Sequence, residues 1–303
     1  MANISATLIK ELREKTGAGM LDCKKALQEN DGDMEAAIDF LRKKGIASAA
    51  KKSARLASEG LIEILAEGDR AVIVEVNSET DFVAKNENFQ NFVAQIAQHV
   101  WQKQPQDLAT MMTQTFADSG KDVQNIQSEM VAKIGENIAI RRFQIVPIES
   151  SERVGSYLHM GSKIGALVKV KADFEKVSAD ILKDIAMHIA ATSPRFVSEQ
   201  DISDDVKERE RDIYRAQMKE SGKPADILEK IIDGKMQKFA KEICLNEQIF
   251  VKDPEAKKSV LGYLKTFDPQ AEIVTFVRFQ VGEGMEKKSE NFAEEVAKQI
   301  QGN

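Results

Sequence analysis

The segment "EVNSETDFVAKNENF" (75–89) contains a pair of side chains whose types need an explanation. Asp81 is followed directly by Phe82, where the preceding pattern predicts that a strand ends. A connection between elements is normally polar and solvated, so an apolar ring there either packs back onto the core or is held out for a partner. In the first case Phe82 packs on a helix over 87–101 and Asp81 caps its turn. In the second case the pair forms a contact site.

Side chains that could hold a metal or act as nucleophiles show no useful spacing. His99, His159 and His188 are not clustered with cysteines or carboxylates in the manner of a zinc site. Cys23 lacks the flanking residues of a catalytic nucleophile and is expected in the core of a helical bundle. The Gly-Lys pairs of "MGSKIG" and "SGKP" lack Walker spacing and are better explained as turns. We therefore predict no enzymatic centre, no metal site and no cofactor.

Composition narrows the class of protein. The chain has 303 residues, of which 42% are hydrophobic and 30% charged, as is typical of a soluble protein with two or more domains. A formal net charge of −6 gives no global sign of nucleic-acid or membrane binding. Two distant cysteines, an N-terminus that soon becomes charged and the absence of a long apolar run predict a cytoplasmic protein.

The N-terminal part must carry its own small bundle. Residues 1–46 are predicted to form a three-helix module, with a break at the glycines of "TGAGM". Asp33 is the expected N-cap of the third helix, and Gly45 is its expected C-terminal stop. A bundle this short has a marginal core and is expected to bind a partner rather than to catalyse. Residues 47–58 are predicted to be a linker, whose basic charge suits either an acidic partner or a solvated hinge.

The rest of the chain predicts two related α+β subdomains, at 59–140 and 141–280. Each has two strand-like runs around a turn, "EGDR" in the first and "MGSK" in the second, followed by a helix. The two helices share the similar strings "QIAQHV" and "DIAMHI". His159 stands just before the second turn and is either a contact residue or an ordinary polar turn residue. The apolar face of the first helix is predicted to comprise Phe89, Phe92, Val93, Ile96 and Val100.

Two further helical segments are predicted beside this α+β core. An antiparallel helical hairpin at about 203–244 is inserted in the second subdomain, and it either supports a homodimer or simply projects. After a final strand, residues 281–303 are predicted to form a C-terminal amphipathic helix. The residues expected to line the hairpin seam are Val206, Ile213, Met218, Ile227, Ile231 and Phe239.

Four segments together resemble bacterial elongation factor Ts. "LREKTGAGMLDCKKAL" (12–27) and "EVNSETDFVAK" (75–85) are similar to the two signature segments of that family. "KIGENIAIRR" (133–142) and "VRFQVGEG" (277–284) resemble it too, and the order of elements matches over essentially the whole chain. The resemblance implies a ubiquitin-associated-like N-terminal module, a duplicated core with a helical hairpin, and a C-terminal helix. It also implies a guanine nucleotide exchange factor for elongation factor Tu.

The resemblance also implies roles for particular residues. The tip that would enter the GTPase beside its nucleotide and Mg²⁺ comprises Thr80, Asp81, Phe82 and Val83. Further partner contacts are implied for Arg13, Met20, Leu21, Ile134, Gly135 and His159. Bundle core is the alternative position for Leu21, and Ile134 could equally be buried. The chain departs from the family at Met160, since glycine commonly follows the histidine directly.

Two functions of other classes remain open from the residues alone. In one, the protein is an adaptor whose N-terminal bundle recruits a helix or a small domain. In the other, the basic linker binds RNA, against which the acidic balance and the 6% aromatic content argue. Direct contact with nucleic acid or a membrane is therefore not expected.

Overall fold

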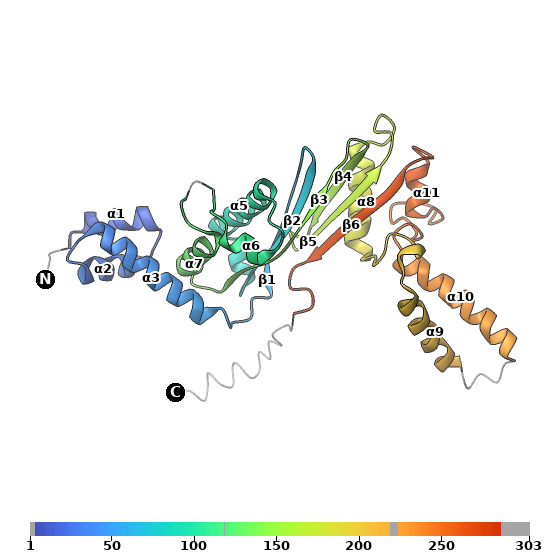
Figure 1. Ribbon diagram of the computed structural model, residues 1–303, viewed down its shortest axis with the longest axis horizontal. Coiled ribbons are helices and arrows are strands. Elements are labelled where there is room, and N and C mark those ends of the chain that lie inside the picture. The colour runs from blue at the N-terminus through green and yellow to red at the C-terminus, as the bar shows by residue number, and fades with distance from the viewer. Residues whose placement is uncertain (1–3, 118, 219–223, 286–303) are drawn as a thin grey trace. The chain divides into compact units, whose positions relative to one another are not determined.

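A computed structural model of the chain describes residues 4–117, 119–218 and 224–285 (Figure 1). The chain divides into two compact units. The first holds the described residues of Met1–Ile62, Val74–Phe143 and Gln280–Asn303, and the second holds those of Glu63–Ile73 and Gln144–Phe279. The architecture is α+β, with N-terminal helices and two small antiparallel sheets, which confirms the predicted fold class.

The first unit begins with the predicted three helices, α1 (Ala6–Thr16), α2 (Met20–Glu29) and α3 (Met34–Lys52). The glycine break lies where expected, because Gly17 ends α1 in the left-handed conformation at φ 67°. Asp33 caps α3, its carboxylate accepting a hydrogen bond of 2.8 Å from the Ala36 amide. The small core contains Leu12, Cys23, Ala26, Leu27 and Ala37.

The predicted end of the third helix at Gly45 is wrong. Helix α3 runs through this glycine as far as Lys52 and so includes about half of the predicted linker. A Cβ atom added to Gly45 would lie 3.2 Å from the Cβ atom of Ala132 on α7 (Val123–Ile134). The glycine is therefore kept for the close packing of two helices rather than for a helix end.

The first sheet contains β1 (Glu59–Glu67), β2 (Arg70–Ser78) and β3 (Ile138–Pro147), in the order β1-β2-β3. The "EGDR" turn joins β1 to β2 as predicted, whereas β3 was not recognised as a strand. Between β2 and β3 the chain forms α4 (Asp81–Ala84), α5 (Glu87–Lys103), α6 (Leu108–Thr113) and α7. The predicted apolar face of α5 is confirmed, since Phe89, Phe92, Val93, Ile96 and Val100 are all buried.

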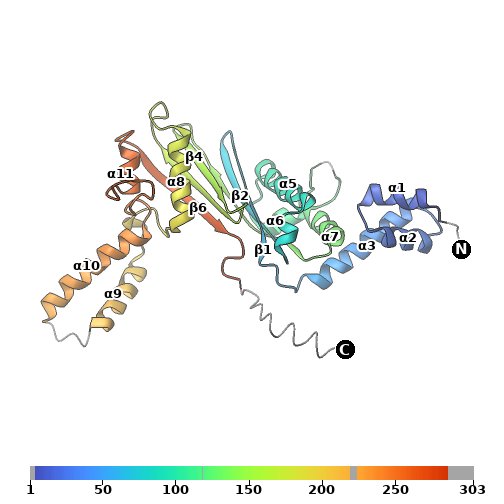
Figure 2. The ribbon, with the colours of Figure 1, turned by 180° about the vertical axis from the view of Figure 1, so that it is seen from behind.

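The second unit is built around the sheet β4-β5-β6, formed by β4 (Glu152–His159), β5 (Ile164–Lys171) and β6 (Glu272–Gln280). Strands β4 and β5 form an antiparallel hairpin in which Glu152 faces Lys171 and His159 faces Ile164. Helix α8 (Ala179–Thr192) lies across this sheet, contacting β4 and β5 (Figure 2). The core between them includes Val168, Val170, Ile181, Ile185 and Ile189.

The second unit also carries the predicted helical hairpin, formed by α9 (Asp204–Met218) and α10 (Ala225–Ile243) (Figure 1). The 3-10 turn η1 (Glu199–Asp201) precedes it, and α11 (Val260–Lys265) follows it before β6. Ile213 and Ile227 are each 43% exposed, so these two residues were wrongly assigned to the seam. Ion pairs supplement the seam, such as Arg211 with Asp233 at 2.6 Å. Of the predicted C-terminal helix at 281–303, residues 281–285 form turns and a bend instead, and the remainder lies outside the described residues.

Candidate partner-binding site

The segment after β2 forms a tip that buries one apolar side chain and exposes its neighbour. Thr80 is the N-cap of α4, a helix of a single turn. Val83 is buried at 7% exposure, whereas Phe82 is 78% exposed. The interpretation in which Phe82 packs onto the following helix is therefore wrong, and the ring is held out in solvent. An apolar ring in this position is available for burial by another molecule.

Asp81 does not cap the following helix. Asn86 is the N-cap of α5, its side-chain oxygen accepting hydrogen bonds from the amides of Asn88 (2.9 Å) and Phe89 (3.4 Å). Asp81 instead forms an exposed ion pair of 2.9 Å with Lys85, one helical turn later. The Lys85 ammonium also lies 5.7 Å from the centre of the Phe82 ring. Exposed i,i+4 pairs contribute only about 0.3–0.5 kcal/mol, so a partner can displace this one easily.

The tip is tied to the loop between α7 and β3 through two crossed carboxylate contacts. Glu136 accepts hydrogen bonds from the Thr80 amide at 3.0 Å and from the Thr80 hydroxyl at 2.8 Å. In return, Glu79 accepts a hydrogen bond of 2.6 Å from the Asn137 amide. These contacts bring the predicted contact residue Gly135, next to Glu136, beside the predicted tip.

Glu79 and Glu136 were not singled out from the sequence. Their only signal is position, since Glu79 immediately precedes Thr80 and Glu136 immediately follows Gly135. Gly135 ends α7 in the left-handed conformation at φ 89°. No described atom would lie within 4 Å of a Cβ atom at this position, so the backbone conformation rather than lack of space favours glycine. Ile134 before it is half-buried, so part of its side chain remains available at the surface.

The N-terminal module exposes a second group of predicted contact residues. Leu21 is 83% exposed and Met20 is 49% exposed at the start of α2, and Arg13 is exposed on α1. The alternative that placed Leu21 in the bundle core is therefore wrong. Cys23 was expected in the bundle and is indeed fully buried, and its burial raises the pKa of the thiol.

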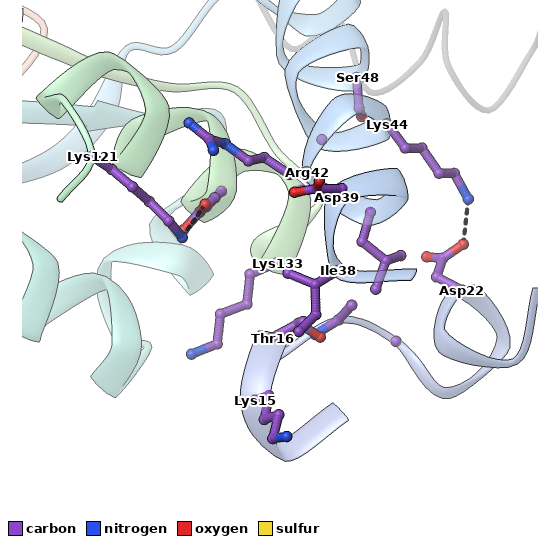
Figure 3. A pocket seen from close by; sticks show the side chains of 16 residues that line it. Lys15, Thr16, Asp22, Ile38, Asp39, Arg42, Lys44, Ser48, Lys121 and Lys133 are labelled. Carbon is purple, nitrogen blue, oxygen red and sulfur yellow. Dashed lines mark hydrogen bonds and ion pairs between the residues drawn. The ribbon is translucent and has the colours of Figure 1, made fainter. Parts of the chain in front are cut away.

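A charged cavity of about 390 Å³ lies between the N-terminal module and α7 (Figure 3). Four of the charged residues that line the cavity pair with each other, Lys44 with Asp22 at 2.5 Å and Lys121 with Glu129 at 2.6 Å. None of the tip residues lines it. The charged side chains around it are Lys15, Asp22, Asp39, Arg42, Lys44, Lys121, Glu129 and Lys133.

The remaining predicted contact residue, His159, lies in the second unit at the end of β4. Its side chain is exposed, and its Nδ1 atom lies 3.1 Å from the hydroxyl of Tyr157, with the two rings stacked at 5.7 Å. Met160 after it adopts the left-handed conformation at φ 52° and is 69% exposed. That conformation explains why glycine suits this position, since a side chain there costs roughly 1–2 kcal/mol.

The other two histidines serve the interior rather than a reactive centre. His99 accepts or donates a 3.0 Å hydrogen bond with Gln114, and His188 pairs with Gln248 at 2.9 Å. Burial lowers the pKa of both imidazoles, which favours their neutral forms. Within the described parts of the chain, no group of three or more His, Cys, Asp or Glu side chains could hold a metal ion. The described helices include none long and apolar enough to cross a membrane.

The chain is similar to known proteins. The family model described as Elongation factor TS matches residues 79–283, which begins at the tip and includes the second sheet. A protein of Trichlorobacter lovleyi named "Elongation factor Ts" is 51% identical over 306 aligned positions, covering 97% of each chain.

Proposed function

Because this chain belongs to the elongation factor Ts family of translation elongation factors, we propose that it accelerates GDP release from elongation factor Tu. Residues Thr80–Val83 would enter the GTPase beside its nucleotide and its Mg²⁺. The observation that carries the proposal is the 78% exposure of Phe82, on a tip whose first residue, Thr80, is hydrogen-bonded to Glu136. An exposed ring on a fixed backbone is ready for burial in a partner.

The thermodynamic requirement is coupling between two binding equilibria. An exchange factor must bind its GTPase more tightly without GDP than with it, and the GTPase must then bind GDP more weakly by the same factor. Burying the Phe82 ring contributes about 1.5–3 kcal/mol, which corresponds to roughly a tenfold to a hundredfold effect. A large acceleration therefore needs a further contribution. Displacement of the partner's Mg²⁺ supplies one, because the metal neutralises the phosphate oxygens of the bound nucleotide.

In this proposal Asp81 acts on the surroundings of that metal. Its carboxylate forms an exposed ion pair with Lys85 at 2.9 Å. Exchanging this pair for hydrogen bonds to the partner's metal-bound water costs little, since exposed pairs are weak. Asp81 would thus perturb the water and hydrogen-bond network of the partner's Mg²⁺, while Phe82 separates the apolar elements around it.

The same proposal assigns anchoring roles to residues away from the tip. Exposed apolar side chains at the start of α2 would bind the GTPase, and the turn at the end of α7 would contact it beside the tip. The residues proposed as anchors are Arg13, Met20, Leu21, Ile134, Gly135 and His159. Anchors are needed because one wedge cannot supply both the affinity and the change in nucleotide binding.

The proposed activity breaks no covalent bond, so the protein would not be an enzyme in the chemical sense. The proposal requires no cofactor and no contact of this chain with nucleic acid or a membrane. It places the protein in the cytoplasm with elongation factor Tu. A homodimer formed through the α9–α10 hairpin is compatible with it but is not required.

The test is stopped-flow release of a fluorescent GDP analogue from elongation factor Tu at several Mg²⁺ concentrations. We expect the wild-type protein to accelerate release and Phe82→Ala to lose about tenfold or more of that acceleration. Val274→Ala is the matched control, because Val274 is a partly exposed apolar residue on β6 without a proposed contact. Equal acceleration by wild type and Phe82→Ala would contradict the wedge mechanism.

The exposed α2 residues keep the adaptor function as a second candidate. In that function the 83% exposed Leu21 carries binding to a helix or a small domain, and the tip has no role. Leu21→Ala would then abolish partner binding, and the wild-type protein would not accelerate GDP release. An exchange factor would instead retain part of its activity in Leu21→Ala, because the tip and the other anchors remain.

A further inference from the structure

We infer that Glu136 is a positioning residue that holds the Phe82 tip in the orientation needed for nucleotide exchange. The inference rests on the proposed function and identifies a part of the site beyond the expected contact residues. Glu136 uses both carboxylate oxygens on Thr80, with Oε2 accepting from the amide at 3.0 Å and Oε1 accepting from the hydroxyl at 2.8 Å. Hydrogen bonds to an ionised carboxylate are among the stronger ones in proteins.

Helix α4 needs such support because its own sequence does not supply it. It contains one turn, and a helix of that length does not persist by itself. In a capping box, the acid three residues after the N-cap bonds back to the N-cap amide. Here the residue three positions after Thr80 is Val83, and the Thr80 side chain makes no cap hydrogen bond to α4. Glu136 fills the position of the missing acid from 56 residues away in the sequence.

A second, crossed contact prevents the tip from turning about the first. Glu79 accepts hydrogen bonds from the Asn137 amide at 2.6 Å and from the Arg55 guanidinium at 3.4 Å. Asn137 in turn donates from its side chain to the Arg55 carbonyl at 2.8 Å. Glu79 and Thr80, at the entry to the tip, are thus joined to two neighbouring residues of the α7–β3 loop. Phe82 and the turn at Gly135 are therefore presented as one preformed surface.

If Glu136 only positions the tip, its loss affects the kinetics of GDP release differently from the loss of a residue that contacts the partner. A tip without the Glu136 clamp would populate the inserting orientation only part of the time, and the apparent effect of insertion falls with that fraction. The anchors on α2 would be unaffected, so binding of the GTPase would remain close to normal. Loss of Glu136 should therefore lower the maximal rate of GDP release, while the concentration of half-maximal effect changes little.

The experiment measures GDP release from elongation factor Tu against exchange-factor concentration for a set of single variants. We expect Glu136→Ala and Thr80→Val each to lower the maximal release rate about tenfold, the loss that corresponds to a charge-assisted hydrogen bond. Thr80→Ser keeps the hydroxyl and should retain most of the rate. Glu129→Ala is the matched control, since it removes a half-exposed carboxylate from α7 that does not touch the tip.

A double variant tests whether the two residues act through each other. Glu136→Ala combined with Thr80→Val should be no slower than Glu136→Ala alone, because Glu136→Ala already lacks the hydroxyl hydrogen bond that Thr80→Val removes. Thermal melts of every variant identify those that are unfolded, and Thr80→Val changes too few atoms to disrupt the core. Additive losses in the double variant would overturn the inference.

The outcomes separate this inference from the function on which it rests. If the wild-type protein does not accelerate release, the proposed function fails and the positioning role fails with it. If wild type accelerates release and Glu136→Ala reaches the same maximal rate, only the positioning role is overturned. If Glu136→Ala needs a higher exchange-factor concentration for half-maximal release but reaches the wild-type maximal rate, the positioning role is likewise overturned. Glu136 would then be a partner contact.

Discussion

Phe82 and Val83 are neighbours with opposite exposure, and this contrast defines the tip at the scale of single residues. The buried valine fixes the short helix to its own unit, whereas the exposed ring beside it lies 5.7 Å from the Lys85 ammonium. An exposed phenylalanine contributes little to folding, so it can be replaced without the cavity cost of a core substitution. Phe82→Ala is therefore a clean test of function.

His188 is a residue whose protonation state is fixed by its neighbours. The Gln248 amide nitrogen donates to the Glu242 carbonyl at 2.7 Å, which leaves its oxygen to accept from the imidazole Nε2 at 2.9 Å. The other ring nitrogen, Nδ1, accepts from the Val251 amide at 3.2 Å. A proton on Nδ1 would face that amide hydrogen, and burial also lowers the pKa of the imidazole.

This arrangement predicts that the second unit loses stability in mild acid. The unfolded imidazole takes up a proton near pH 6.5, whereas the folded one resists protonation until a lower pH. Each pH unit below about 6.5 should therefore cost up to about 1.4 kcal/mol until folded His188 is protonated. Urea unfolding at pH 7.5 and pH 5.5 measures this cost, and His188→Gln should show a smaller difference. Equal pH dependence in the two proteins would show that His188 does not contribute.

At the scale of elements, α3 and α7 pack closely because Gly45 has no side chain. A Cβ at this position would already lie 3.2 Å from Ala132, and a larger side chain would force the two helices apart. A glycine inside a helix costs about 1 kcal/mol relative to alanine. The contact between the helices must offset that cost for α3 to continue through the position.

Gly45→Leu should accordingly destabilise the first unit by about 1–3 kcal/mol through overpacking. Ala47→Leu is the matched control, because Ala47 is exposed on the same helix and should change stability by less than about 0.5 kcal/mol. Denaturant unfolding followed by circular dichroism gives both values. A stabilised Gly45→Leu variant would mean that helix propensity, and not the α3–α7 contact, dominates at this position.

At the scale of the whole molecule, a buried carboxylate joins segments that are far apart in the chain. Glu75 is fully buried on β2 and accepts hydrogen bonds from Arg141 at 2.9 Å, Arg142 at 2.6 Å and the Gly282 amide at 2.9 Å. Arg141 also donates to the carbonyl of Glu283, and Arg142 pairs with its carboxylate at 3.2 Å. The network holds the chain where it returns to the first unit after β6.

Burial alone would raise the pKa of Glu75, but the Gly282 amide and the two guanidinium groups outweigh it and hold the pKa below its usual value. A lowered folded pKa means that the stabilisation is present above about pH 4.3, the ordinary glutamate value, and is lost as the pH falls through the folded pKa. Glu75→Gln should destabilise the first unit by about 3–5 kcal/mol at neutral pH, because it removes the buried charge that two partly buried guanidinium groups pair with.

The control for that prediction is Glu283→Gln, which removes a half-exposed carboxylate from the same network. Its expected cost is below about 1 kcal/mol, the range of exposed ion pairs. Urea midpoints at neutral pH compare the two variants. Similar losses in both would show that burial of Glu75 carries no special weight.

The sequence alone was sufficient for most local features. The repeats of apolar residues predicted α5 and α8, Asp33 was recognised as a cap, and the turns "EGDR" and "MGSK" lie between the strands as expected. Such features depend on free energies of a few neighbouring residues, so the order of residue types is enough to reveal them. The exposed Phe82 tip was noticed for the same reason, since an aromatic residue at a strand end violates the local pattern.

Only the tertiary structure decided which distant residues meet. Glu136 lies 56 residues from its partner Thr80, and Gly282 lies 207 residues from its partner Glu75, and no periodicity or spacing in the sequence relates them. Gly45 was misinterpreted for the same reason. A glycine locally indicates a helix end, and only the close approach of Ala132 in the folded chain shows that it permits helix packing instead. A carboxylate can bond to any nearby donor, so the choice of donor follows from how the chain packs rather than from the carboxylate's own sequence neighbours.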